Sequence, residues 1–149
     1  MVRLKSAYIV KCESFTKDAA GKIAEIHCTY IPESKSGGDA SDIKVKGTIH
    51  WVSAAHAVNA EVRLYDRLFK AENPANEEGD FKDNINPDSL QIITNAVVEP
   101  SLKNATLQNR YQFIRKGYFC LDKDFTADKL VFNRTVTLKD AWAKEVKKN

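Results

Sequence analysis

The sequence has few of the residues that cross-link a small secreted domain or hold a structural metal. Its 149 residues contain three cysteines, Cys12, Cys28 and Cys120, and no Cys-x-x-Cys pair. A disulfide framework uses an even number of cysteines, and a zinc ribbon uses closely spaced pairs, so we expect neither. Reduced thiols are typical of a reducing compartment, and we therefore expect a cytoplasmic protein.

Long apolar runs are also missing. No segment approaches the roughly 20 apolar residues that a membrane-spanning helix requires. The first residues, MVRLKSAYIVK, carry charges where the apolar centre of a signal peptide would lie. We expect neither membrane insertion nor secretion.

The sequence lacks the common catalytic motifs. It contains no Gly-x-Ser-x-Gly elbow, no phosphate-binding glycine loop and no His-Glu-x-x-His. His27, Cys28 and Cys12 could meet on a hairpin as a zinc site, but the usual ligand spacing is missing. We therefore expect no catalytic residue, metal or cofactor in this chain, and a small metal-dependent hydrolase is disfavoured.

The composition that remains is that of a globular protein. Hydrophobic residues make up 43% of the chain and charged residues 29%, which is ordinary for one domain or two small lobes. The net charge of +3 permits an acidic partner such as RNA without requiring one. Where the cations lie therefore matters more than their number.

Alternation of apolar and polar residues predicts an all-β fold, in a barrel or a sandwich. The predicted strands are 2–15, 23–30, 46–52, 56–69, 90–99, 110–117, 118–122 and 130–138. The first two form a hairpin that turns at Gly21, and a helical turn is expected near Phe81–Ile85. Thr137 and Asp140 have the spacing of a capping box, which predicts one short C-terminal helix.

Residues 111–119, YQFIRKGYF, combine four aromatic rings with a glutamine and two cations. Alternation along a strand places Tyr111 and Phe113 on the face opposite Gln112. We therefore expect the rings to pack mostly in the core, while Gln112 and Arg115 remain available to a ligand.

Several segments closely resemble bacterial-type glutaminyl-tRNA synthetase. They are KGTIHWVSAAHAVNAEVRLYDRLF (46–69), INPDSL (85–90), EPSLKNA (99–105), YQFIRKGYFCLD (111–122), FNRTVTLKDAWAK (132–144) and VRLKSAYIVK near the start. Together they cover nearly the whole chain apart from two loops, and they correspond to the C-terminal, anticodon-binding part of that family. The resemblance implies an all-β architecture of two barrels, related to a ribosomal protein that binds 5S ribosomal RNA.

The resemblance also implies a domain organisation. We expect residues 1–149 to be an anticodon-binding region, comprising the distal barrel and part of the proximal barrel, excised from a longer glutamine–tRNA ligase. The Rossmann-type catalytic domain, which binds ATP with magnesium in the family, is then outside this chain, as are the basic residues that contact the third anticodon base. The implied partners are the anticodon loop of glutamine tRNA and the catalytic domain, with a monomeric protein and no membrane.

The resemblance assigns Gln112 to the middle anticodon base, which is uracil. A carboxamide has one acceptor and donors that complement the uracil edge. Arg115 matches the arginine of the same Gln-Phe-x-Arg pattern and would donate to a base or a phosphate. In a regular strand these two residues point to opposite faces, so we expect a bend or bulge near Gly117; a surface salt bridge is the alternative for Arg115. Ile114 stands where the family carries an acidic residue.

Arg3 matches a family arginine that contacts the first anticodon base, and Lys5 lies two residues further on the same predicted face. The family carries an arginine at the position of Lys5. Because lysine is a point charge and not a planar fork, Lys5 suits a phosphate better than a base edge, and a solvated strand residue is its alternative.

Two other RNA-binding functions remain open. One is the anticodon-binding region of an archaeal or eukaryotic-type glutamyl-tRNA synthetase, whose barrels are related. The other is a free-standing ribosomal-type RNA-binding β-barrel, which the synthetase-like block at 46–69 disfavours.

Overall fold

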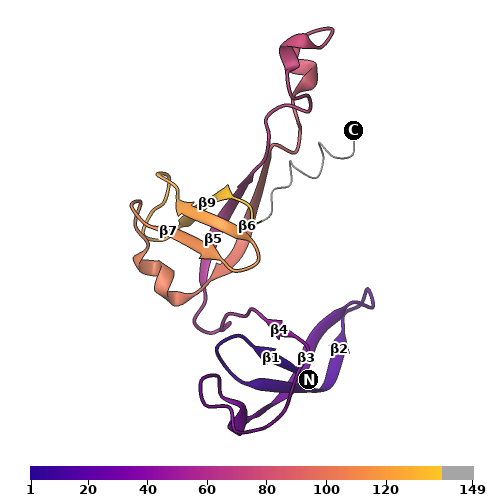
Figure 1. Cartoon of the computed structure of the whole chain (residues 1–149), viewed down its shortest axis with the longest axis vertical. Coiled ribbons are helices and arrows are strands. Elements are labelled where there is room, and N and C mark those ends of the chain that lie inside the picture. Colours follow the sequence, from indigo (N-terminus) through magenta and orange to yellow (C-terminus); the bar gives the residue numbers. More distant parts are fainter. Residues whose placement is uncertain (139–149) are drawn as a thin grey trace. The chain divides into compact units, whose positions relative to one another are not determined.

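The computed structural model describes residues 1–138, and its strands fall in two compact units, Met1–Trp51 and Val52–Asn149. Each unit contains one β-sheet, and the only helices in the described residues are short 3-10 turns. The all-β prediction is therefore confirmed (Figure 1). The helix expected after Thr137 lies outside the described residues.

The first unit holds a four-stranded sheet with the order β3-β2-β1-β4. Its strands are β1 (Val2–Leu4), β2 (Ile9–Lys17), β3 (Ile23–Ile31) and β4 (Thr48–Ile49), and η1 (Pro32–Ser34) follows β3. The predicted β2–β3 hairpin is confirmed, with Gly21 in its turn at a φ of 77°. Asp18 closes this turn, because its backbone N–H donates to the Lys22 carbonyl at 2.8 Å.

The strand predicted over 46–52 is shorter than expected. Only Thr48 and Ile49 pair, and they run parallel to β1, which is itself three residues long. The polypeptide beyond them is held by a side chain instead, since the Trp51 indole Nε1 donates to the Lys5 carbonyl at 3.0 Å.

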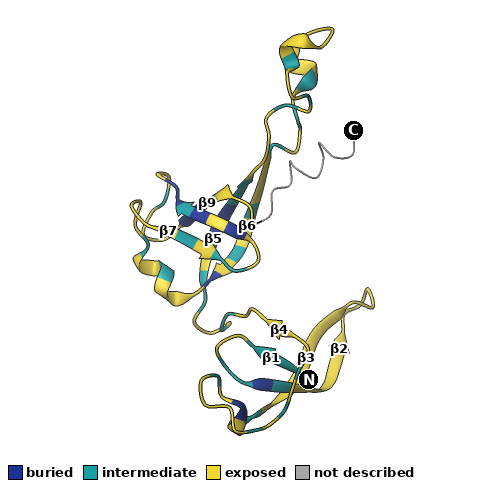
Figure 2. Cartoon of the chain, in the orientation of Figure 1, coloured by how far each residue is buried: buried dark blue, intermediate teal, exposed yellow. Residues whose placement is uncertain are grey.

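Ile9 and Ser34 form the small buried centre of the first unit. The Ser34 hydroxyl accepts from the Ile9 backbone N–H at 2.7 Å and donates to the Ile31 carbonyl at 2.7 Å. It thereby joins the open ends of β2 and β3. The rest of the hairpin, residues 11–30, is exposed on both faces (Figure 2).

The second unit holds a five-stranded sheet with the order β6-β5-β9-β8-β7. Its strands are β5 (Val58–Tyr65), β6 (Leu90–Val98), β7 (Arg110–Phe113), β8 (Gly117–Leu121) and β9 (Leu130–Val136). β5 and β9 are parallel, and the other neighbouring pairs are antiparallel. The turn η4 (Pro100–Asn104) lies between β6 and β7.

The core of the second unit is aromatic. Phe119 and Phe132 are almost completely buried, and Phe113 stacks on Phe119 with ring centroids 4.2 Å apart. Tyr111 meets Phe132 edge to face at 5.8 Å. The prediction that the rings of β7 pack in the core is therefore confirmed for Tyr111 and Phe113.

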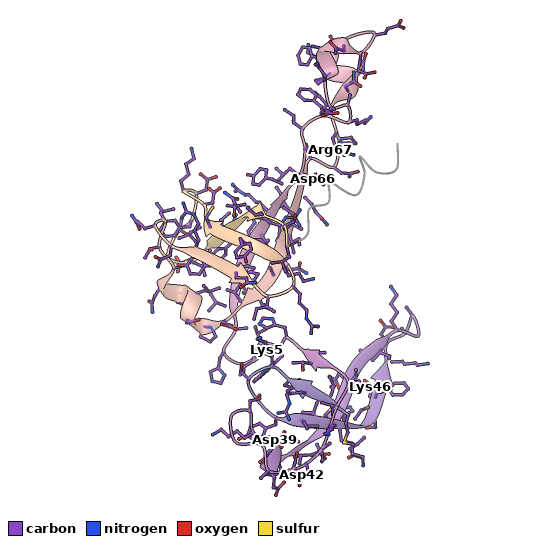
Figure 3. The ribbon with its side chains drawn as sticks, in the orientation of Figure 1. Lys5, Asp39, Asp42, Lys46, Asp66 and Arg67 are labelled. Carbon is purple, nitrogen blue, oxygen red and sulfur yellow. The ribbon has the colours of Figure 1, made fainter. Side chains whose placement is uncertain are left out.

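A long connection between β5 and β6 forms an arm that extends from the sheet (Figure 1). Asp66 and Arg67 lie at its base (Figure 3), and the bridge between Phe69 and Ile85 holds its two sides together. The arm carries η2 (Pro74–Asn76) and η3 (Phe81–Asn84), and the latter confirms the helical turn expected near Phe81–Ile85.

Neither sheet is a closed barrel within residues 1–138. Closure of the first sheet requires β3 to pair with β4, and closure of the second requires β6 to pair with β7. The strand pairings in the described residues include neither contact. The barrel expectation is therefore corrected to two open sheets.

Candidate nucleic-acid interface

The β7–β8 hairpin places Gln112 and Arg115 on one element. Strand pairing stops at Phe113, and Ile114, Arg115 and Lys116 form the turn. The Lys116 N–H donates to the Phe113 carbonyl at 2.8 Å, and Arg115 has a left-handed φ of 65°. Because Arg115 lies in a turn, the alternation of a strand does not direct its side chain away from the Gln112 face.

Gly117 follows the turn and permits β8 to lie against β9. Its φ is 142°, and a Cβ there would lie 2.6 Å from the Val136 carbonyl oxygen. The pairing of β7 with β8 is regular up to Gly117, and the register shift falls one residue later, in the pairing of β8 with β9. The expected bend is thus a turn and not a bulge in β7.

Gln112 is exposed on the outer face of the hairpin, opposite the aromatic core. Its cross-strand partner is Tyr118, which is 44% exposed. Residues directly opposite on antiparallel strands have their Cβ atoms about 5 Å apart. An amide and an aromatic ring therefore share one exposed face, and the sequence alone did not single out Tyr118.

Arg3 lies on β1, and its guanidinium already has partners. It donates to the Ser34 carbonyl at 2.7 Å and forms a close ion pair with Asp39. The pKa of Asp39 lies below its ordinary value, chiefly because the Ser41 hydroxyl and backbone N–H donate to it, with Arg3 contributing less. The Arg3 side chain is 20% exposed.

Lys5 lies just beyond the end of β1, in the turn toward β2, so period-two alternation with Arg3 does not place it. Its backbone is held on both sides, because its N–H donates to the Ile49 carbonyl at 2.9 Å and its own carbonyl accepts from Trp51. The side chain is exposed (Figure 3). Arg3 and Lys5 belong to the first unit, while Gln112 and Arg115 belong to the second.

An ionic cluster supports the second sheet, and it was not predicted from the sequence. The Arg63 guanidinium lies 2.8 Å from Glu61, 3.4 Å from Asp122 and 3.1 Å from Asp124. Lys129 adds a second cation, 2.8 Å from Glu61. The cluster ties β5 to the segments that follow β8 and precede β9.

These contacts shift the pKa values of Glu61, Asp122 and Arg63 in the direction that favours the charged form of each side chain. The pKa of Glu61 is lowered chiefly by its hydrogen bonds from Lys129 and Arg63. The pKa of Asp122 is lowered chiefly by the Asp124 backbone N–H, against an opposing effect of burial. The pKa of Arg63 is raised by its hydrogen bonds to Glu61 and Asp124. We interpret the cluster as structural support for the hairpin.

Residues 1–138 contain neither a metal-binding cluster nor a membrane-spanning helix. No group of three or more His, Cys, Asp or Glu side chains there could hold a metal ion. In the same part of the chain, no helix has the length and apolar character needed to cross a bilayer.

Comparison with known proteins identifies the family. The model of the family described as "tRNA synthetases class I (E and Q), anti-codon binding domain" matches residues 48–122, which include β5 to β8 and Gln112. The relatives include the glutamine–tRNA ligases of Proteus mirabilis, 57% identical over 143 residues, and of Vibrio parahaemolyticus, 58% identical over 144 residues. That of Rhodopirellula baltica is 54% identical over 145 residues.

These matches cover 96% of this chain but only 24–26% of each relative. The chain therefore spans about a quarter of the length of the curated relatives that it matches. The matched quarter includes both the sheet that carries Arg3 and the sheet that carries Gln112. By these similarities, the chain belongs to the anticodon-binding domain family of the class I glutamyl- and glutaminyl-tRNA synthetases.

Proposed function

We propose that this chain binds the anticodon loop of glutamine tRNA, as the C-terminal part of a glutamine–tRNA ligase. The observation that carries the proposal is the exposed pairing of Gln112 with Tyr118 on a hairpin whose turn holds Arg115 and Lys116. The family match and the relatives at 53–58% identity support the same assignment.

The hairpin has the chemistry needed to read an unpaired uracil. The Gln112 carboxamide accepts from N3–H of the base and donates to a neighbouring carbonyl. Arg115 and Lys116, in the turn, supply charge to the adjoining phosphates. Tyr118 offers its ring as a surface on which a splayed base stacks.

Arg3 and Lys5 are proposed to contact the first base and its phosphate. The Arg3 side chain is 20% exposed, and Lys5 presents an exposed side chain next to a backbone that is fixed by Ile49 and Trp51. We further propose that the two open sheets correspond to the segments that form the distal barrel and part of the proximal barrel in the family.

The reaction of the longer protein is also part of the proposal. It joins glutamine to its tRNA at the expense of ATP, and a catalytic domain outside these 149 residues would bind the ATP and its magnesium ion. The chain itself would act as a monomeric cytoplasmic recognition module and would not catalyse the reaction.

A glutamyl-tRNA synthetase region is the second candidate, because the matched family includes both enzymes. Glutamate anticodons also have uracil in the middle, so Gln112 does not distinguish the two tRNAs. The glutamine–tRNA ligases among the relatives favour the first candidate.

A titration at one fixed salt concentration tests the proposal. The chain should bind glutamine tRNA about tenfold or more tightly than the same tRNA with its middle anticodon uracil replaced by cytosine, a difference of about 1.4 kcal/mol. Affinity for both should fall as salt is raised, because phosphate contacts supply much of it. Equal affinity for the two tRNAs would exclude anticodon reading, and tighter binding of glutamate tRNA would favour the second candidate.

A further inference from the structure

Two cysteines face each other across the β2–β3 hairpin. In the register of this hairpin, Cys12 is the direct partner of Cys28. Both side chains are exposed, and both thiols are reduced. Neither cysteine belongs to the proposed RNA-binding surface, so their placement is a separate feature of the fold.

The hydrogen-bonding pattern shows which kind of cross-strand pair they form. Along β2 the backbone groups of successive residues point alternately toward β1 and β3. The Tyr8 carbonyl accepts from the Leu4 N–H, on the β1 side, at 2.9 Å, whereas the Ile9 N–H points toward β3 and donates to Ser34. By the same alternation the backbone of Cys12 points away from β3. Cys12 and Cys28 are therefore a non-hydrogen-bonded pair.

This kind of pair brings side chains closest together. The Cα atoms of a non-hydrogen-bonded antiparallel pair lie about 4.5 Å apart. Disulfides span Cα separations of about 4.4–6.8 Å, so a pair of this kind lies at the short end of the range that a disulfide can bridge. A register shift lies between Cys12 and Ser14, so Glu13 has no Cα partner in β3, although its carboxylate accepts from the Thr29 hydroxyl at 2.9 Å.

We propose that Cys12 and Cys28 form a dithiol site that small-molecule disulfides of the glutathione type oxidise reversibly. One thiolate attacks the small disulfide, forms a mixed disulfide and releases one small thiol. The second thiolate attacks the protein sulfur of that mixed disulfide, the Cys12–Cys28 bond forms, and a second small thiol leaves. Two protein thiols are oxidised and one small disulfide is reduced to two thiols.

The disulfide would be exposed on the hairpin, and exposed disulfides are reduced more easily than buried structural ones. The site is thus a reversible modification site and not a structural cross-link. A metal site is less suitable here, because no third ligand joins the pair within residues 1–138.

Mass spectrometry of the intact chain tests the proposal. The chain is incubated with oxidised glutathione, quenched with acid and alkylated, with Cys120 as an internal reference because it is half-buried on β8. We expect a product without bound glutathione that has lost two hydrogens, with peptides containing Cys12 and Cys28 linked. Reduced glutathione should restore three alkylatable thiols.

Single variants separate the proposal from ordinary thiol modification. C12S and C28S should each accumulate a glutathione adduct on the remaining cysteine of the pair, whereas C120S should close the disulfide as the wild type does. Circular dichroism before treatment confirms that each variant is folded. Glutathione adducts on both Cys12 and Cys28 of the wild-type chain, with no linked peptides, would overturn the proposal.

Discussion

At the scale of single residues, one exposed ring distinguishes the two faces of the β7–β8 hairpin. Phe113 and Phe119 stack inward, whereas Tyr118 points out beside Gln112. The inner face stabilises the sheet through burial of aromatic surface. The outer face keeps a ring in water, where it is available to stack on a base.

Replacement of Tyr118 by leucine should weaken tRNA binding, because leucine keeps an apolar side chain but removes the stacking surface. The expected loss is about 1–3 kcal/mol, the range for one base stacked on an aromatic side chain. Tyr118→Phe should bind nearly as tightly as the wild type. Tyr65→Leu is the matched control, since Tyr65 is 45% exposed on β5. Equal losses for Tyr118→Leu and Tyr65→Leu in a binding titration would contradict the stacking role.

Asp39 holds the Arg3 guanidinium, and its removal should strengthen binding. Asp39→Asn removes the ion pair and leaves Arg3 available to an RNA phosphate. Asp42→Asn makes the same change of charge three residues away (Figure 3). We expect a larger gain in tRNA affinity at low salt for Asp39→Asn than for Asp42→Asn, and no such difference when Arg3 is also replaced by alanine. Equal gains would mean that Arg3 does not contact the RNA.

At the scale of elements, the hairpin is positioned by a backbone contact and by the ionic cluster. The backbone contact is the approach of Gly117 to the Val136 carbonyl on β9. The ionic cluster of Arg63 with Glu61 and Asp122 fixes β5 and the end of β8 relative to each other. The first contact joins two consecutive strands, and the second joins segments about 60 residues apart in sequence.

Gly117→Ala should destabilise the second unit. The new Cβ would meet the Val136 carbonyl at 2.6 Å, and the φ of 142° is unfavourable for alanine. We expect a loss of roughly 1–3 kcal/mol in the free energy of unfolding, measured by urea denaturation. Gly38→Ala is the control, because a Cβ at Gly38 meets nothing within 4 Å. Similar stability of the two variants would contradict the close contact.

Acid should weaken the ionic cluster. The pKa values of Glu61 and Asp122 are lowered in the folded chain, so their stabilisation is complete above the unfolded-state values of about 4.3 and 3.9 and is lost as the pH falls through the folded values. The free energy of unfolding should therefore decrease below about pH 4. Asp122→Asn should lessen this dependence, whereas Asp128→Asn, an exposed carboxylate, should leave it unchanged. Identical pH profiles of Asp122→Asn and the wild type would contradict the assignment.

At the scale of the whole molecule, local patterns predicted the strands and the β2–β3 hairpin but not the pairing of strands distant in sequence. Alternation located the β2–β3 hairpin and the inward rings of β7, because both depend on neighbouring residues. The parallel pairing of β5 with β9 joins segments about 70 residues apart, and no local pattern indicates it. The strand predicted at 46–52 was too long because the length of a paired strand depends on its partner. The partner here, β1, is short.

The candidate site shows the same limit. Gln112 and Arg115 were identified by the Gln-Phe-x-Arg pattern. Because they are only three residues apart, the sequence also predicts that they lie on one element. The ion pair of Arg3 with Asp39 spans 36 residues and could not be predicted, because it depends on how the loop after η1 folds back. The sequence does not distinguish Tyr118 from the other three rings of residues 111–119. Only the register of β7 with β8 shows that it lies opposite Gln112.

The central claim is that Gln112 reads the middle anticodon base, and a double-mutant cycle tests it most directly. The wild-type chain, Gln112→Ala and the control Gln91→Ala, an exposed glutamine on β6, are each titrated with glutamine tRNA and with its uracil-to-cytosine middle-base variant at one salt concentration. We predict that Gln112→Ala reduces the discrimination between the two tRNAs by about 1–3 kcal/mol, the value of one good base-edge contact, while Gln91→Ala leaves it unchanged. Equal losses of affinity for both tRNAs in Gln112→Ala would contradict the account.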